Sequence, residues 1–552
     1  MRSEASVAVT PPAPAAPPVG AWEPLRHGTF RAMWLAVLAS NVGTWVHDVA
    51  AAWFMSEKTG SPLMVAAVQS ATTLPTVVFA LVAGTLADIV DRRRYLLAVQ
   101  CWMLVMAVAP AVLALHGSLE PWSLLGLTFA LGMGSAMAMP AQAATTADLV
   151  PRPLLAPAVA LSSIGINIAR ALGPALGGVL VARFGVGSAF SLDAVSYLGV
   201  LVVLWRWRST RATTTLPAEP FGVALRAGLR YASQASDLRS VLVKAACFYT
   251  FANALNSQLA IVVRQELGQG AGTYGVLLTC VGAGAVSGAM VLPRLRARLG
   301  IDALVFAASL VYAAVMLTAA HVRDVGVLGG ALFVSGVAWI TVLSSLQTAA
   351  HVSVPTWVRA RALSLYIVVF SAGMAGGSLL WGSVAQRFGT PLALSVAAAT
   401  VVVGALVSLR FRVGAALSRD TTPSGHWPTP AVSDDVERDR GPVLVTVDYT
   451  IAPEGRAEFL ELVARLGRTR RRDGAVQWGV VEDTARPGGF LEYFVVGSWL
   501  EHLRQHERVT HEEKALQERL TALHQAAQPP SVRHFVGATP TLPRPLTPEN
   551  DS

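Results

Sequence analysis

The chain has 552 residues, of which 53% are hydrophobic and 14% charged, and its mean hydropathy is +0.50. Soluble domains carry roughly 25% charged residues, so this composition excludes an ordinary soluble protein and indicates a polytopic membrane protein. The formal net charge is +9, but the arginines lie mainly in alternate connections between apolar runs, which is typical of cytoplasmic loops. We therefore expect a lipid bilayer around the chain, both termini in the cytoplasm and no nucleic-acid partner.

The first 25 residues are rich in Pro and Ala and lack the apolar core of a secretory signal, so we expect a disordered lead over residues 1–25. Apolar runs of about 20 residues, enough to cross roughly 30 Å of hydrocarbon, then follow. They lie near 30–55, 62–87, 95–116, 121–146, 155–182, 187–207, 239–263, 272–293, 302–321, 325–349, 362–384 and 390–411. These runs predict twelve transmembrane helices, six in residues 26–207 and six in 239–412, joined by a cytoplasmic loop over 208–238 with an amphipathic piece at Phe221–Tyr231.

Identical residues recur at one spacing across the two sets of runs. Gly84 corresponds to Gly288 and Arg92 to Arg296, and both subtractions give 204. The same difference relates Arg94 to Arg298, Pro151 to Pro355, Gly173 to Gly377, Gly178 to Gly382, and Arg183-Phe184-Gly185 to Arg387-Phe388-Gly389. This spacing predicts two tandem six-helix bundles in the same orientation, the parallel-repeat architecture of secondary transporters.

A glycine, two aspartates and a run of arginines occupy the connection after the second apolar run. Gly84 permits close helix approach, Asp88 ends the run, and Arg92 and Arg93 can pair with it or with a facing helix end. The pattern resembles the cytoplasmic loop signature of the major facilitator superfamily, although Asp91 stands where the commonest form has glycine. The resemblance implies that Gly84, Asp88, Asp91, Arg92 and Arg93 form an inward gate. A plain basic loop would explain the arginines but not the glycine and the aspartate.

In the fifth run, Gly173, Pro174, Gly177 and Gly178 put a backbone kink beside a face of small residues. This resembles the antiporter signature of drug–proton exporters in the same superfamily, with Ala169 in place of the usual earlier glycine. The resemblance implies export, with the kink sealing the substrate route against leak. Helix packing alone is the alternative reason for these glycines.

Ionisable groups occur well inside the runs at Asp48 with its neighbour His47, at Arg170 and at Asp193. A charge at membrane depth costs about 2.5 to 3.5 kcal/mol, so we expect each group to face a cavity or a partner. The positions 204 residues further on are uncharged, namely Phe251, Ala252, Met374 and Ala397, so we expect ionisable chemistry only in the first half. Our hypothesis is that Asp48 or Asp193 carries a coupling proton and Arg170 tunes it. A static buried ion pair is the alternative.

Polar side chains inside the runs are candidates either for lining a central substrate cavity or for interhelical hydrogen bonds, and the sequence does not divide the two. They are Asn41, Gln69, Asn167, Asn253, Asn256 and Gln258. The chain contains no Gly-x-x-x-x-Gly-Lys-Ser/Thr phosphate loop. We therefore expect protons as the coupling ion, without an ATP motor or a cofactor.

After Arg412 the sequence becomes polar and Pro-rich, which predicts a flexible linker over 413–440, a soluble domain over 441–538 and a disordered tail over 539–552. Periodicity in this domain predicts strands at 442–451, 475–481, 490–499 and 532–536 and helices at 453–471 and 501–524. The order β-α-β-β-α-β is the ferredoxin-like pattern.

His502 and His506 lie one helical turn apart in this domain, with His511 beyond. The spacing is able to bind zinc, but a solvated helix face rich in Glu and Arg is the better account, so we expect no metal. The segment Trp499–His511 resembles the second-helix region of small dimeric α/β-barrel domains related to antibiotic-biosynthesis monooxygenases. The resemblance implies a homodimer through residues 441–538. We see no convincing catalytic set.

Over residues 26–412 the chain resembles the enterobactin-exporter-like branch of the major facilitator superfamily, and its appended domain is similar to that of transmembrane secretion effectors. The resemblance implies an all-α membrane protein with an α+β ferredoxin-like domain at its C-terminus. The expected function is secondary active, proton-coupled export of a siderophore, drug or secondary metabolite across the plasma membrane by alternating access, without catalysis. The alternative is a bifunctional protein whose C-terminal domain is a monooxygenase-like enzyme or a dimerisation or sensor module.

Overall fold

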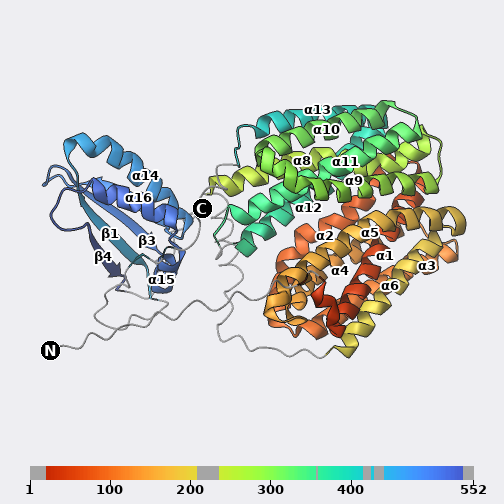
Figure 1. The fold of residues 1–552 in the computed structure, drawn as a ribbon, viewed down its shortest axis with the longest axis horizontal. Coiled ribbons are helices and arrows are strands. Elements are labelled where there is room, and N and C mark those ends of the chain that lie inside the picture. The colour runs from red at the N-terminus through yellow and green to blue at the C-terminus, as the bar shows by residue number, and fades with distance from the viewer. Residues whose placement is uncertain are drawn as a thin grey trace, which may run out of the picture. The chain divides into compact units, whose positions relative to one another are not determined.

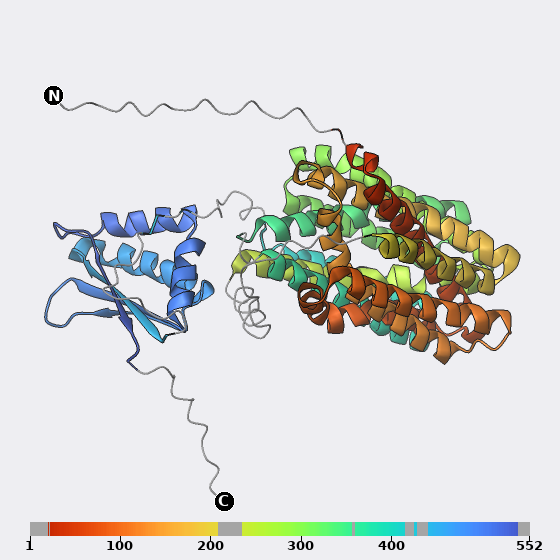
Figure 2. The same cartoon turned by 90° about the horizontal axis from the view of Figure 1, so that it is seen from below.

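The computed structural model describes residues 20, 22–207, 235–355, 359–413, 424, 426–427 and 440–538 (Figures 1 and 2). Most of the predicted lead, the amphipathic piece Phe221–Tyr231, most of the predicted linker and the tail from 539 lie outside the described residues.

Long helices form the part of the chain that precedes the linker. They are α1 (Gly28–Thr59), α2 (Pro62–Ile89), α3 (Arg92–Leu115), α4 (Pro121–Asp148), α5 (Leu155–Phe184), α6 (Val186–Arg206), α8 (Ser236–Ile261), α9 (Ala271–Arg298), α10 (Ile301–His321), α11 (Val325–Val352), α12 (Arg359–Phe388) and α13 (Thr390–Ser408). Within the described residues, 11 helices are long and apolar enough to cross a membrane. Helix α1, with 32 residues, is not among them, because polar groups that include Asn41, His47 and Asp48 interrupt its apolar run.

The 204-residue spacing reappears in the helix bounds. Helices α4 and α11 begin at Pro121 and Val325, and α5 and α12 end at Phe184 and Phe388, each pair 204 positions apart. The residue after each of the latter two is a glycine with positive φ, 77° at Gly185 and 88° at Gly389, a backbone conformation that glycine adopts far more readily than other residues. The fourth to sixth helices of the two halves therefore share one pattern.

The turn between the second and third helices departs from this spacing. Asp91 caps the N-terminus of α3 by accepting a hydrogen bond from the Arg94 amide at 2.9 Å. The position 204 residues later is Leu295, which cannot cap, and α9 continues to Arg298. Equivalent arginines therefore lie at the start of α3 in one half and at the end of α9 in the other.

The chain divides into two compact units, Met1–Ala51 with Val82–Ala212, and Ala52–Leu81 with Thr213–Ser552. The division at 212/213 falls within the loop predicted over 208–238, but residues 52–81, predicted in the first bundle, group with the second unit. In the first unit, Tyr95, Leu96 and Met103 of α3 pack with Tyr197 and Leu204 of α6 in a buried core.

In the second unit, the end of α1 and most of α2 are bonded to later helices. The Ser61 hydroxyl donates to Gln386 Oε1 at 2.6 Å, and the Ser70 hydroxyl donates to the Ala375 carbonyl at 2.8 Å. The Gln265 amide, in the π-helical turn Val262–Glu266 after α8, donates to the Gly60 carbonyl at 2.7 Å. These contacts hold residues 52–81 against α12 and the end of α8.

The C-terminal domain contains β1 (Val443–Thr450), α14 (Arg456–Arg472), β2 (Gln477–Glu482), β3 (Gly489–Val496), α15 (Trp499–Arg508), α16 (His511–Ala522) and β4 (Ser531–Val536). The strands form one antiparallel sheet in the order β2-β3-β1-β4, which is compatible with the predicted ferredoxin-like pattern. The helix predicted over 501–524 is wrong as one element, because Thr510 and Glu513 form a capping box that starts α16 as a separate helix.

Described residues of the predicted linker are attached to this domain. The Ser424 hydroxyl donates to the Val509 carbonyl at 3.0 Å, and the Trp427 indole donates to Gln517 Oε1 at 2.9 Å. The Trp427 ring also stacks over the Arg470 guanidinium, 4.7 Å from ring centroid to Cζ.

Candidate substrate cavity and buried ionisable cluster

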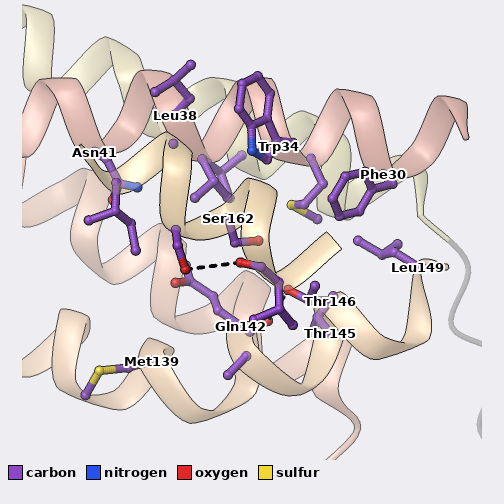
Figure 3. A pocket seen from close by; sticks show the side chains of 18 of the residues that line it. Phe30, Trp34, Leu38, Asn41, Met139, Gln142, Thr145, Thr146, Leu149 and Ser162 are labelled. Atoms are coloured by element: carbon purple, nitrogen blue, oxygen red, sulfur yellow. Dashed lines mark hydrogen bonds between the residues drawn. The ribbon is translucent and has the colours of Figure 1, made fainter. Parts of the chain in front are cut away.

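A cavity of about 330 Å³ lies within the first unit. Helix α1 lines it with Phe30, Met33, Trp34, Val37, Leu38 and Asn41. These positions follow the i, i+3, i+4, i+7 pattern of a single helix face. Figure 3 shows Phe30, Trp34, Leu38 and Asn41 along that helix, facing Gln142 and Ser162 from other helices.

Helices α4 and α5 supply most of the polar lining, namely Gln142, Thr145, Thr146, Ser162 and Ser163. The Thr145 and Ser162 hydroxyls donate to carbonyls of their own helices at 2.7 and 3.0 Å, which leaves their oxygens able to accept a hydrogen bond from a guest. None of the described lining residues is charged. The cavity therefore suits a guest that is mostly apolar and recognised by a few hydrogen bonds.

Trp34 connects α1 to α5 at the cavity wall. Its indole nitrogen donates to the Leu161 carbonyl at 2.8 Å. The ring lies close to the backbone of α5, since a Cβ at Gly165 would be in van der Waals contact with the same nitrogen at 3.4 Å. The hydrogen bond fixes the indole, which then presents its apolar face as part of a preformed wall.

A histidine and an aspartate predicted as proton-coupling candidates meet in the interior of the first unit. His47 Nδ1 on α1 lies 3.1 Å from Asp193 Oδ2 on α6, and the two side chains are 2% and 0% exposed. The Phe190 ring packs edge-on against His47 at 5.0 Å between centroids. A Cβ at Gly43 would lie 3.0 Å from Asp193 Oδ1, so the glycine permits this close approach of α6 to α1.

The other two coupling candidates are placed differently. Asp48 is half-buried and near enough to His47 and Asp193 for their charges to interact. Arg170 lies over the Trp45 ring, with its Cζ 5.9 Å from the centroid, and among the described residues it forms no ion pair with Asp48 or Asp193. The cluster is therefore His47, Asp48 and Asp193, with Arg170 outside it.

The second half also contains a buried ion pair, which was not predicted from the sequence. Lys244 on α8 is 2% exposed, and its Nζ lies 2.9 Å from Asp302 Oδ1 at the start of α10. The Asp302 carboxylate also accepts from the Val413 amide at 3.0 Å. This pair joins two helix ends to the chain that leaves α13. The apolar-run criterion missed Lys244 because it lies close to the start of its helix.

The arginines of the predicted gating loop bind the ends of neighbouring helices. Arg92 pairs with Asp148 at the end of α4 at 2.7 Å, and the Arg93 side chain donates to the Leu204 carbonyl in the last turn of α6 at 2.9 Å. Arg296, which is 204 residues after Arg92, donates to the Ser344 hydroxyl of α11 at 3.0 Å. The surroundings of Gly84 and of the Asp88 side chain lie outside what the structure describes.

The glycines of the predicted kink motif lie where α5 packs on α1. Gly173, Pro174, Gly177 and Gly178 are all buried. A Cβ at Gly173 would collide with the Cβ of Trp45, and one at Gly177 would lie 3.0 Å from the Cβ of Val49. Close helix packing thus accounts for Gly173 and Gly177, and it leaves the role of the Gly-Pro pair in export as a prediction.

The predicted cavity residues fall into two groups. Asn41 lines the cavity, whereas Gln69, Asn167, Asn253, Asn256 and Gln258 are not among its lining residues. The Asn253 amide donates to the Met374 carbonyl at 2.7 Å, and the Gln258 amide donates to the Pro62 carbonyl at 3.5 Å, so these two bridge helices. The Asn167 amide donates to Ser163 of its own helix at 2.9 Å.

The C-terminal domain holds a buried carboxylate that sequence reasoning missed. Glu492 of β3 is 0% exposed and accepts from the Trp478 indole at 3.0 Å and from Arg470 Nε at 3.4 Å. The Tyr449 hydroxyl donates to its other oxygen at 3.4 Å, and burial raises the pKa of Tyr449. These donors reach both side-chain oxygens of Glu492, which makes the cluster a structural part of the domain core.

The prediction that the α15 histidines lie on a solvated face is wrong for His502, which is 1% exposed. Burial, with smaller contributions from the neighbouring His534 and His506, lowers the pKa of His502 to about 3. Burial also lowers the pKa of His534.

Long apolar helices around a preformed cavity define a multi-pass membrane transporter. The family model described as "Transmembrane secretion effector" matches residues 19–541, and the chain belongs to this family of major facilitator transporters. Its family consists of transporters that move small molecules across membranes, so the chain is a transporter of the cell membrane and not primarily an enzyme.

Relatives and solved structures agree with this class. The chain is 25% identical over 385 residues to the uncharacterized MFS-type transporter YfiS of Bacillus subtilis, which covers 67% of this chain and 90% of the relative. It is 22% identical over 279 residues to the staphyloferrin A transporter of Staphylococcus aureus, a match that covers 50% of this chain and 70% of the relative. It is 25% identical over 169 residues to macrolide efflux protein A of Streptococcus pyogenes, a match that covers 30% of this chain and 41% of the relative. A bacterial homologue of the human lysosomal transporter Spinster, solved in an inward-facing and occupied conformation, superposes with a TM-score of 0.56 at 15% identity over 71% of this chain and 98% of that chain. That likeness shows the fold.

Proposed function

We propose that this protein is a proton-coupled exporter of a small, uncharged or weakly charged organic molecule. The observation that carries the proposal is the charge-free cavity of the first unit together with the buried His47–Asp193 pair, because α1 and α6 contribute to both. The cavity supplies a place for a substrate, and the His47–Asp193 pair supplies a place for a proton. Movement of α1 or α6 would act on both.

The lining argues for the substrate class. Phe30, Met33, Trp34 and Met139 offer apolar and polarisable surface, while Gln142 offers a hydrogen-bonding amide. A cavity of about 330 Å³ is at the small end of ligand sites, which run roughly from 300 to 1,000 Å³. A carboxylate-rich siderophore would find no described cation in this lining. We therefore favour an amphipathic drug or secondary metabolite over an anionic siderophore.

We assign the coupling proton to the His47–Asp193 pair, with Asp48 as the second acidic group. The imidazole and the carboxylate at 3.1 Å are able to share one proton in a site without solvent. Asn41 in the cavity wall lies six residues before His47 on α1, about 9 Å along the helix. A change in protonation would thus be transmitted along one rigid helix. A static pair remains the alternative.

The direction of transport follows from placing the chain by its arginines. With both termini in the cytoplasm, the cavity from Phe30 to Asn41 lies in the cytoplasmic half of α1, while His47 lies further out. A cytoplasmic cavity suits loading from the cytoplasm, and the Gly173-Pro174 pair resembles the motif of drug–proton exporters. The assignment to the enterobactin-exporter-like branch is a separate proposal that rests on the sequence resemblance over residues 26–412 and not on the cavity.

Inverted membrane vesicles test this proposal. Vesicles with the protein should accumulate an uncharged amphipathic dye when a proton gradient is imposed, and a protonophore should abolish accumulation. A carboxylate-rich siderophore should accumulate no faster than in vesicles without the protein. Accumulation of the siderophore alone would reject the substrate class, and uptake indifferent to the protonophore would reject proton coupling.

We further propose that the C-terminal domain, which is similar to monooxygenase-related α/β-barrel domains, pairs two copies of the chain. Its outer sheet face carries Leu444 and Phe535, which are cross-strand neighbours, and Val481 opposite Leu491. Phe535 is 48% and Val481 47% exposed. Light scattering of the detergent-purified chain should give a dimer, and Phe535→Glu should shift it to a monomer.

A further inference from the structure

Three histidines of the C-terminal domain gather at one point between its sheet and α15. His502 and His506 lie one turn apart on α15, and His534 lies on β4. One ring nitrogen from each is within 4.8 Å of the others. The two Nε2 atoms of His502 and His506 are 3.2 Å apart.

The strand register explains how His534 reaches the helix. His534 is directly opposite Val445 of β1, and Val445 is opposite Phe494 of β3. Val445 and Phe494 are buried beneath the helices, and directly opposed residues share a face of the sheet. His534 therefore points toward α15, where its ring lies 4.7 Å from that of His502.

The surroundings are unusual for a purely structural trio of histidines. His502 is 1% exposed, and its Nδ1 has no hydrogen-bond partner within the described part of the chain. The Trp499 ring packs at a tilt against the His502 ring, with 5.3 Å between centroids, and the Trp427 ring packs edge-on against the His506 ring, with 4.8 Å between centroids. The two indoles thus flank the histidines, and the Arg470 guanidinium lies over the Trp427 ring, 4.7 Å from its centroid.

We propose that His502, His506 and His534 bind one divalent transition-metal ion of the zinc type, with a fourth position left for water or another ligand. In tetrahedral coordination with bonds of about 2.0 to 2.1 Å, ligand nitrogens lie about 3.3 Å apart. The 3.2 Å separation of His502 and His506 already matches this value, and small side-chain rotations bring in His534. Neutral nitrogen ligands suit Zn²⁺, Co²⁺, Ni²⁺ and Cu²⁺ and disfavour the oxygen-seeking Mg²⁺ and Ca²⁺.

Metal content of the full-length protein tests this site directly. The protein is purified in detergent with a tag free of histidine, stripped with a chelator, incubated with ZnCl₂ and separated from free metal before elemental analysis. The wild type should hold about one Zn²⁺ per chain, and MgCl₂ in place of ZnCl₂ should give none. Co²⁺ should give the intense visible absorption of a tetrahedral site.

Variants separate the site from adventitious binding. His534→Gln and His506→Gln should each lose the bound Zn²⁺ and the Co²⁺ absorption, while His511→Gln, at an exposed histidine of the same region, should keep both. His506 is only partly buried, so its variant keeps the test valid if His534→Gln fails to elute as a folded species. Equal Zn²⁺ in the wild type, His506→Gln and His511→Gln would overturn the proposal, as would a wild type that retains no Zn²⁺.

Discussion

Asp193→Asn is the substitution that separates a proton-coupling role from a structural one. The new amide has the shape of the carboxylate and is able to donate a hydrogen bond to neutral His47 Nδ1, which lies 3.1 Å from Asp193 Oδ2. The contact between α1 and α6 is therefore kept. The substitution removes the Asp193 carboxylate, the group that we propose shares the coupling proton with His47.

The size of the effect follows from the driving force. One proton moving through 100 mV releases about 2.3 kcal/mol, which sustains a substrate gradient of roughly fiftyfold at about 1.36 kcal/mol per decade. If Asp193 belongs to the only coupling site, the variant should sustain a gradient of about one. Exchange of labelled for unlabelled substrate needs no net proton movement, so it should continue at a rate near that of the wild type.

Proteoliposomes allow both measurements on one preparation. Asp302→Asn is the matched control, because Asp302 is also an aspartate paired with a buried nitrogen base, Lys244, but belongs to the helix-end pair of the second half. This control should keep proton-driven accumulation. A static-pair account predicts instead that Asp193→Asn lowers folded yield and reduces accumulation and exchange together. Full accumulation by Asp193→Asn would refute the assignment of the proton to this pair.

Three further substitutions test the cavity, the packing of α5 and the C-terminal domain. Gln142→Leu removes an amide from the cavity wall and should raise the KM for transport roughly two- to tenfold, which corresponds to the loss of one net hydrogen bond. Asn167→Leu changes a residue outside the wall and should leave the KM unchanged. Gly173→Ala drives a methyl group into Trp45 and should destabilise the protein by about 1 to 3 kcal/mol in thermal unfolding. Gly376→Ala should cause no such loss, because the added methyl group would meet no atom of the described residues within 4 Å. Burial, reinforced by the charge of Asp473, raises the pKa of Glu513 from 4.5 to about 7. The folded domain therefore favours the protonated carboxyl group, whose contribution to the free energy of unfolding is fully present below pH 4.5. This contribution is lost as the pH rises through 7, by up to about 3 kcal/mol. Glu513→Gln should therefore flatten the fall in the melting temperature of this domain between about pH 5 and about pH 8, and an unchanged fall would contradict the shift.

Sequence patterns predict best the features that lie within a single helix or strand, such as where a helix ends and which residues share one of its faces. The spacing of 204 residues predicted the shared bounds of α5 and α12, because identical glycines end both helices. The stripe of Phe30, Trp34, Leu38 and Asn41 is also visible in the sequence as a helical face, and the run Gln142, Thr145 and Thr146 on α4 is a second such signal. Of the residues predicted to line a cavity, only Asn41 does so in the first unit, because a single polar residue in an apolar helix does not by itself distinguish a cavity wall from a helix contact.

Contacts between distant segments could not be predicted in this way. His47 meets Asp193 only because Gly43 lets α6 approach α1 closely, and no local pattern encodes that approach. His534 likewise joins His502 through the register of β4 on β1. His47 and Asp193 are 146 positions apart in the sequence, and His502 and His534 are 32 positions apart. Both sites therefore depend on packing between separate segments.

Proton movement driven by substrate alone tests the central claim most directly. Proteoliposomes containing the wild type and a pH-sensitive dye are given a gradient of transported substrate, with no initial pH difference or membrane potential. The account predicts a substrate-dependent pH change inside the vesicles, with protons moving opposite to the substrate, and no such change for Asp193→Asn. Substrate flux through the wild type without any pH change would contradict it.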